Sequence, residues 1–216
     1  MFIFGRLLAD RRFDGIGCYV SNFEDDISMN YLFDFITETA SRLPIAIMSD
    51  AAPAITKSLK QKMKKQERLM CWAHVMEKVT AKLSPVRALD PDMSRAIQDD
   101  IRIIQAGSLD ENMFILLLSL FQRKWTGMTM TNSTLKEKVL NFITYFLKVW
   151  GRDSDTRKWF QGANPQSSST NNANESQNNV FKQDFTDRKR LSIPDLFDKL
   201  FEMMKEWDSK KPVPKA

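Results

Sequence analysis

The chain has 216 residues, of which 43% are hydrophobic, so it can bury a sizeable core and is not a disordered tail. It carries 32 Lys and Arg against 27 Asp and Glu, a mixed and mildly basic balance. No stretch approaches the ~20 uninterrupted apolar residues of a membrane span, and two cysteines are too few for a disulfide framework. We therefore expect a soluble, intracellular protein with free thiols.

The first third of the chain alternates strand-like and helix-like patterns. The predicted segments are strands at 1–8 and 13–21, a helix at 27–42, a strand at 44–48, a Lys-rich helix at 51–66 and a strand at 68–72. In the first of these helices, Tyr31, Leu32, Phe35 and Ile36 share one face. This order of elements predicts a mixed sheet with helices packed on it.

Asp50 follows the apolar strand 44–48 in the run Ser49-Asp50-Ala51-Ala52-Pro53. In open α/β sheets, ligands gather beyond the carboxyl ends of the strands, so a carboxylate at this corner is a candidate functional group. The alternative is a structural role as the N-cap of the helix that follows.

The middle of the chain shows helical periodicity without a strand pattern. The predicted helices are 75–83, 93–105, 111–123 and 134–150, the last capped by Asn132 or Ser133 and stopped at Gly151. A polar, turn-rich segment at 161–174 predicts a mobile loop, and helical patterns return at 175–185 and 193–207.

Two further groups could carry chemistry. Cys71 and His74 form a C-x-x-H pair that can share one metal, but a structural zinc needs four ligands and Cys18 is the one thiol left, so zinc is not predicted. The alternative is a packed Cys and a hydrogen-bonded His. Glu175 lies within N-x-x-E-S-x-x-N, where the alternative is an acid that complements a helix N-terminus.

Basic residues gather after the Asp50 corner, from Lys57 to Arg68, and again near the C-terminus. Such clusters can neutralise phosphates, and a solvated helix face explains each of them equally well. The candidate DNA contacts are Lys57, Lys60, Lys64, Lys182, Arg188, Lys189 and Arg190.

Taken in order, Asp50, the C-x-x-H of Cys71 and His74, a long helical block and Glu175 resemble the catalytic core of Mutator-like element (MULE) transposases. The resemblance implies an α/β, ribonuclease H-like mixed sheet with a large all-helical insertion. It also implies that Asp50 and Glu175 are the second and third acids of a DDE triad that holds two Mg²⁺ or Mn²⁺ ions, and that Cys71 and His74 have a structural or DNA-positioning role.

The family's first Asp, on the first and central strand of its sheet, has no counterpart here; Asp10 in the hairpin turn is the one early candidate. Without that strand, either residues 1–8 pair antiparallel with residues 44–48 or a strand-wide gap remains. We therefore expect a fragment of the catalytic domain that binds Mg²⁺ weakly and is inactive as this isolated chain.

The resulting domain prediction is a partial ribonuclease H-like part at 1–75, a helical insertion at 76–160, a mobile loop at 161–174, C-terminal helices at 175–208 and a disordered tail at 209–216. The implied function is Mg²⁺-dependent DNA cleavage and strand transfer in the nucleus. The implied partners are DNA, as element ends and target, and a second copy of the chain, with no membrane and no small-molecule substrate. The alternative is a non-enzymatic, transposase-derived nuclear protein that binds DNA or other proteins.

Overall fold

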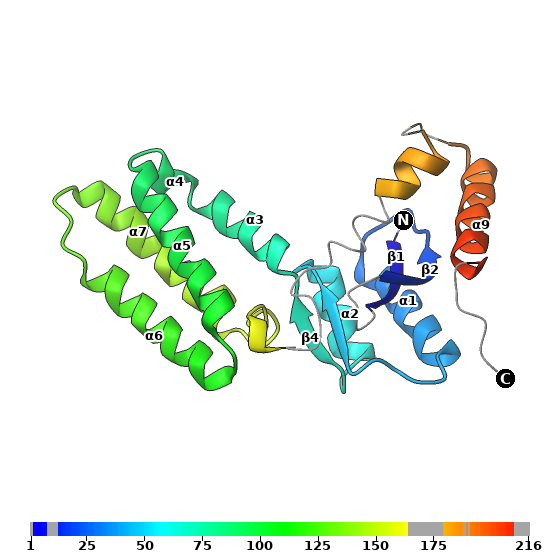
Figure 1. Cartoon of the computed structure of the whole chain (residues 1–216), viewed down its shortest axis with the longest axis horizontal. Helices are drawn as coiled ribbons and strands as arrows, with labels where there is room; N and C mark the ends of the chain where they lie inside the picture. The colour runs from blue at the N-terminus through cyan, green and yellow to red at the C-terminus, as the bar shows by residue number, and fades with distance from the viewer. Residues whose placement is uncertain (1, 8–12, 164–178, 188, 190, 210–216) are drawn as a thin grey trace. The chain divides into compact units, whose positions relative to one another are not determined.

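A computed structural model describes residues 2–7, 13–163, 179–187, 189 and 191–209 (Figure 1). The protein is mixed α/β, mostly helical, with two small sheets. It divides into two compact units: unit 1 comprises Met1–Glu24 and Asn171–Ala216, and unit 2 comprises Asp25–Thr170. In the described part of the chain, no helix combines the length and the apolar character that crossing a membrane requires.

Unit 1 combines the two ends of the chain. Its elements are β1 (Phe2–Leu7), β2 (Phe13–Tyr19), the π-helical turn η3 (Phe181–Phe185) and α9 (Ile193–Ser209). The predicted hairpin is confirmed, because β1 and β2 pair antiparallel. A small core buries Ile3 with Phe181, Leu200 and Met203. A Cβ at Gly15 would lie only 2.4 Å from the Trp207 ring, so the absence of a side chain lets that ring pack on β2.

Unit 2 begins with a small α/β part. Its elements are α1 (Asp26–Thr39), β3 (Ala46–Ser49), α2 (Pro53–Lys62) and β4 (Glu67–Met70). The strands pair in parallel, with Ala46 opposite Glu67, and α2 provides the crossover that parallel strands need. α1 and α2 are tied together where the Ser58 hydroxyl donates to the main-chain carbonyl of Asp26 at 3.0 Å.

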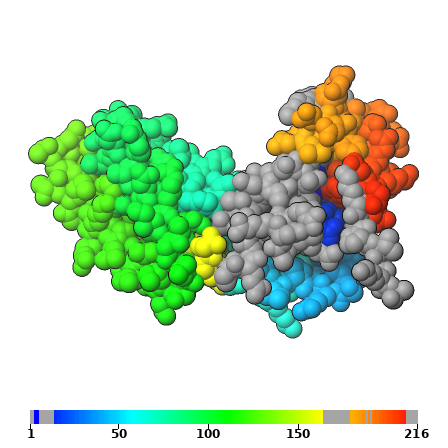
Figure 2. Space-filling view, in the orientation of Figure 1, coloured from blue at the N-terminus to red at the C-terminus, as the bar shows by residue number. Residues whose placement is uncertain are grey.

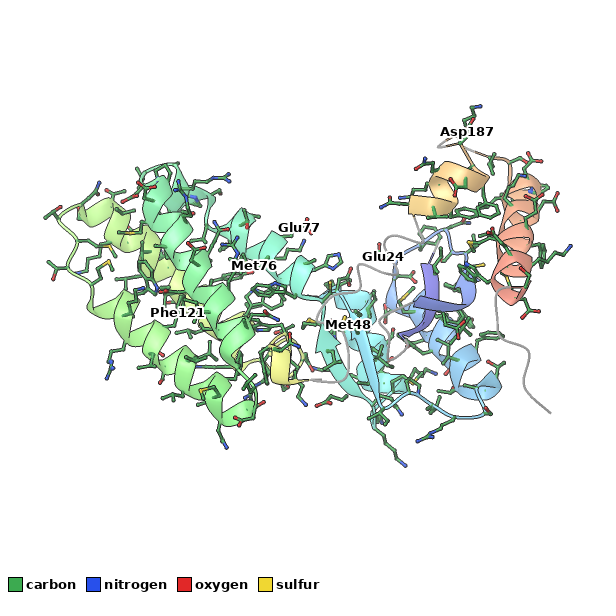
Figure 3. The ribbon with its side chains drawn as sticks, viewed as in Figure 1. Glu24, Met48, Met76, Glu77, Phe121 and Asp187 are labelled. Atoms are coloured by element: carbon green, nitrogen blue, oxygen red, sulfur yellow. The ribbon has the colours of Figure 1, made fainter. Side chains whose placement is uncertain are left out.

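The rest of unit 2 is a helical block. Its elements are α3 (Trp72–Lys82), α4 (Ser84–Arg87), α5 (Pro91–Gly107), α6 (Glu111–Gly127), α7 (Ser133–Phe146), the π-helical turn η1 (Leu147–Arg152) and the short 3₁₀ turn η2 (Gln161–Ala163). Figure 1 shows α5, α6 and α7 side by side. Their inward faces share one apolar core that includes Ile97, Phe114 and Phe146, and Phe121 lies in it as well (Figure 3).

Local capping explains where the helices of this block start. Asp90, Asp110 and Asn132 each accept a hydrogen bond from the backbone N–H three residues further on. These are N-cap contacts, which satisfy amides that the first helical turn leaves without a partner. Of the two predicted caps for α7, the structure selects Asn132.

The single mixed sheet expected from the sequence is not what the structure shows. The four strands form one antiparallel pair, β1 with β2, and one parallel pair, β3 with β4, and within the described ranges no ladder joins the two pairs. The predicted direct pairing of residues 1–8 with residues 44–48 is not among the ladders of the described residues. In each pair the two strands are consecutive in the chain, which keeps the connecting segment short and its loop-closure entropy low.

The buried face of α1 also differs from the prediction. Tyr31 is 67% exposed and Phe35 is 56% exposed, whereas Met29, Leu32 and Phe33 are buried. The packing of α1 against α2 decides which face is covered. Periodicity alone does not, because apolar residues lie on both sides of this helix.

The end of the helical block is more ordered than the sequence pattern indicates. The predicted stop at Gly151 is wrong, since α7 passes into η1, which continues to Arg152, and Gly151 is buried within it. The first residues of the predicted mobile loop form η2, where the Gly162 N–H donates to the Ser108 carbonyl at 2.8 Å. Residues 164–174 lie outside the described part of the chain.

Candidate functional site

Asp50 lies directly beyond β3, at the carboxyl end of the parallel strand pair. The backbone N–H of Ala52 donates to its Oδ1 at 3.0 Å, which closes a local turn. α2 starts at Pro53 with Ala52 as its N-cap and without a side-chain cap bond. Asp50 therefore orders the chain that leads into α2 but does not cap the helix. Its orientation is fixed at the end of the strand.

Arg68 on β4 contacts the main chain at the same corner. Its Nη2 donates to the main-chain carbonyl of Asp50 at 2.8 Å. Its Nε and Nη1 are buried and have no hydrogen-bond partner within the described residues. Burial lowers the pKa of the Arg68 guanidinium, and the carboxylates of Asp155, Asp50 and Asp153 act in the opposite direction. The group stays charged, so the corner contains a cation with two unused donors.

An acidic turn after η1 supplies two of these carboxylates. The N–H of Asp155 donates to Asp153 Oδ1 at 2.9 Å. Asp155 also pairs with Lys60 of α2 at 2.5 Å, and this hydrogen bond raises the pKa of Lys60. The turn is anchored to the sheet because the Met70 N–H of β4 donates to the Lys158 carbonyl at 2.9 Å. The corner thus combines three carboxylates with two cations.

Cys71 and His74 lie where β4 passes into α3. The Cys71 N–H donates to the Ser49 carbonyl at 3.1 Å, which places Cys71 beside the residue that precedes Asp50. Its side chain is fully buried and its backbone forms the N-cap position of α3. His74 is half-buried in the first turn of α3. A buried thiol of this kind fits a packing role.

The structure brings together Asp50 and Cys71, at the ends of neighbouring strands. Glu175, the second predicted metal ligand, lies outside the described residues, as do Asp10, Arg188 and Arg190. No group of three or more His, Cys, Asp and Glu side chains suited to a metal is found in the ranges that the structure describes. A cation site made of Asp50 and Glu175 therefore stays a prediction.

Several of the predicted DNA contacts already have acidic partners. Lys57 pairs with Asp26 at 2.5 Å, and Lys189 pairs with Asp187 at 3.0 Å. Lys60 pairs with Asp155 at 2.5 Å, and the neighbouring Lys62, which is not a predicted contact, pairs with Asp34 at 2.7 Å. Such exposed ion pairs are weak, so a phosphate can displace the carboxylate. Each pair nevertheless neutralises part of the positive charge that DNA would meet. The remaining positive charge near α2 is concentrated at exposed Lys64 and its neighbour Lys65, for which no ion pair occurs among the described residues.

From the sequence, Arg68 was only one member of a basic stretch, and Asp153 and Asp155 were not named as site residues. The one local signal for the two aspartates was their Asp-x-Asp spacing shortly after a predicted helix. Its place beside β4 follows from the contact between Met70 and Lys158, which joins positions far apart in the chain. A contact of that range leaves no local pattern.

Comparisons with family models, curated proteins and solved structures find no match to this chain.

Proposed function

We propose that this chain carries part of the catalytic core of a Mutator-like element transposase, with a ribonuclease H-like arrangement around β3 and β4. The observation that carries the proposal is the position of Asp50 at the carboxyl end of a parallel strand, with its orientation fixed by Ala52. Sequence order supports it as well, because Asp50 is followed by Cys71, His74, a helical block and Glu175.

In this proposal Asp50 is one carboxylate ligand of a divalent cation and Glu175 is another. The Ala52 N–H uses only one lone-pair direction of the Asp50 carboxylate, which leaves capacity for a cation. A Mg²⁺ or Mn²⁺ ion held by Asp50 and Glu175 would supply Lewis-acid chemistry to the attacking and leaving oxygens of a phosphodiester. The protein's own part is to hold Asp50 in place and to position the DNA backbone.

Arg68 is the cation of this corner whose charge acts on a DNA phosphate. Its Nε and Nη1 are buried, so they are not open to a phosphate in the described structure. The charge of the guanidinium still attracts a phosphate to the corner through its electrostatic field. The carboxylates of Asp50, Asp153 and Asp155 repel the same phosphate, so we expect DNA binding here to depend on a divalent cation.

The test combines Mn²⁺ binding and DNA binding on the full chain. Paramagnetic broadening of amide signals by Mn²⁺ should be strongest near Ala52, with weak affinity because few ligands are present. The affinity for a short DNA duplex should rise when Mn²⁺ is added. Asp50→Asn keeps the oxygen that Ala52 bonds and removes the charge, so it should abolish both effects without disturbing the fold.

Asp153→Asn is the matched control, because it also removes one carboxylate charge near Arg68 and keeps an oxygen for the Asp155 N–H. It should leave the broadening at Ala52 in place. If both variants lost the broadening and the gain in DNA affinity equally, Mn²⁺ would be responding only to the total negative charge of the corner. That result would overturn the assignment of Asp50 as a ligand.

The second candidate function is non-enzymatic DNA binding, favoured by the exposed Lys64 and Lys65 just after the end of α2. It predicts an affinity for DNA that is independent of Mn²⁺ and of Asp50. Lys64→Ala should then weaken binding for all sequences and reduce its salt dependence. Lys62→Ala, which removes a lysine already paired with Asp34, should have a smaller effect.

A further inference from the structure

The outer face of α6 carries an apolar stripe that is exposed in the described part of the chain. Met113, Leu116 and Leu120 follow each other at helical spacing and are 40%, 51% and 41% exposed. The opposite face of α6 buries Phe114, Leu118 and Phe121 in the core of the block. The helix is therefore apolar on both sides, which is unusual for a surface helix that faces only water.

Ile103 of α5 extends this stripe onto the neighbouring helix. A Cβ at Gly107 would lie 3.3 Å from Leu117, and Lys124 pairs with Asp100 at 2.7 Å, so the two helices run alongside each other. Ile103 lies between Asp100 and Gly107 along α5, level with Leu120 on α6, and is 60% exposed. We call Ile103, Met113, Leu116 and Leu120 the α6 patch. Figure 2 shows the helical block whose surface carries it.

We propose that the α6 patch binds the same patch of a second copy of this chain, with the two α6 helices antiparallel across a two-fold axis. The argument is charge complementarity. Asp110 caps the start of α6 and Arg123 lies near its basic end, whereas Glu111 and Lys124 are already paired within the chain, with Arg157 and Asp100. An antiparallel crossing therefore sets Asp110 of each copy against Arg123 of the other, and the helix dipoles are also opposed.

The sequence of α6 is symmetric about the point between Leu116 and Leu117. Met113 and Leu120 lie equally far from that point on opposite sides, and so do Asp110 and Arg123. A two-fold axis there places Met113 against Leu120 of the other copy. A parallel arrangement instead sets like charges together. The patch is small compared with obligate dimer interfaces, so we expect a reversible dimer with micromolar affinity.

The first test is sedimentation velocity of the full chain over a concentration series. The wild type should shift from monomer to dimer at micromolar concentration. Leu116→Glu should remain monomeric. Ile115→Glu is the control, because Ile115 is on the same helix and 52% exposed but lies off the stripe. It should dimerise like the wild type. A wild type that stays monomeric, or a Leu116→Glu dimer of unchanged affinity, would overturn the proposal.

The second test fixes the orientation by disulfide trapping in a Cys18→Ser background. Leu116→Cys, next to the axis, should cross-link to itself. Met113→Cys should cross-link efficiently with Leu120→Cys in a mixture and poorly with itself. The reverse pattern would show a parallel pair and contradict the proposal. Neither test involves a metal or DNA, so the outcome is independent of the proposed transposase function.

Discussion

The helical block of unit 2 and the core of unit 1 are built in opposite ways. The block is one continuous stretch of chain, and its core includes large side chains such as Phe114, Phe146 and Trp150. Unit 1 buries Ile3 from one end of the chain against Phe181, Leu200 and Met203 from the other, with its packing completed by partly buried neighbours. The first arrangement gains stability from local contacts, whereas the second must pay for closing a very long loop.

The largest effect is expected from Phe114→Ala in the helical block. Phe114 is fully buried and stacks on Phe160 with ring centroids 4.4 Å apart, and its ring is edge-on to Trp159 at 5.4 Å. Its loss should lower the free energy of unfolding of unit 2 by about 3–5 kcal/mol. The buried Cys71 thiol reports unfolding of this unit through its rate of modification. A loss of less than ~1 kcal/mol would contradict a tightly packed block.

Leu200→Ala should have the second largest effect, and it should act on unit 1. Removing this buried side chain should cost about 2–4 kcal/mol. Burial raises the pKa of the Cys18 thiol, so Cys18 should react slowly at neutral pH in the wild type and faster in the variant. Phe197→Ala, an exposed position on the same helix, is the control. If Cys71 is unprotected to the same extent as Cys18, the two units unfold together and the comparison fails.

Gly162→Ala should have an intermediate effect, because η2 closes against the connection between α5 and α6. A Cβ at Gly162 would lie 2.1 Å from the main-chain carbonyl of Leu109, which no side-chain adjustment relieves. We expect a loss of about 1–3 kcal/mol in the stability of unit 2. Gly127→Ala is the matched control, because a Cβ there meets nothing within 4 Å. Equal thermal shifts for the two variants would show that η2 is not closely packed.

The difference between local and long-range contacts also decides what could be predicted from the sequence. The helices of the block could be predicted because their period is local, and so is the predicted cap at Asn132; the caps at Asp90 and Asp110 were not predicted. The contact of Met70 with Lys158 and the pairing of strands into two sheets are long-range, and neither leaves a local pattern. The Asp50 corner was predictable for the same reason as the helices. Its neighbours Asp153 and Asp155 were not singled out, because tertiary contacts bring them there.

Asn132→Ala should cost about 1 kcal/mol, because its Oδ1 accepts the Leu135 N–H at 3.0 Å and caps α7. Ser133→Ala should change the stability of unit 2 by less than half of that, since Ser133 lies inside the helix. The two variants remove side chains of similar size from neighbouring positions, only one of which caps the helix. Chemical denaturation of both variants decides which residue sets the start of α7, and a larger loss for Ser133→Ala would contradict the structure.

The smallest effect is expected from the ion pair of Lys57 and Asp26, which links α2 to α1 at the surface. The hydrogen bond from Lys57 lowers the pKa of Asp26 below the usual value of an aspartate side chain. A carboxyl with a lowered folded-state pKa stabilises the fold above its unfolded-state pKa, and that contribution is lost as the pH falls through the folded-state pKa. Lys57→Met should therefore reduce the loss of stability below about pH 4. Lys64→Met, which removes a lysine that has no ion pair among the described residues, should leave this acid dependence unchanged. Denaturant midpoints measured across that pH range for both variants test whether surface charges or buried side chains hold α1 on α2.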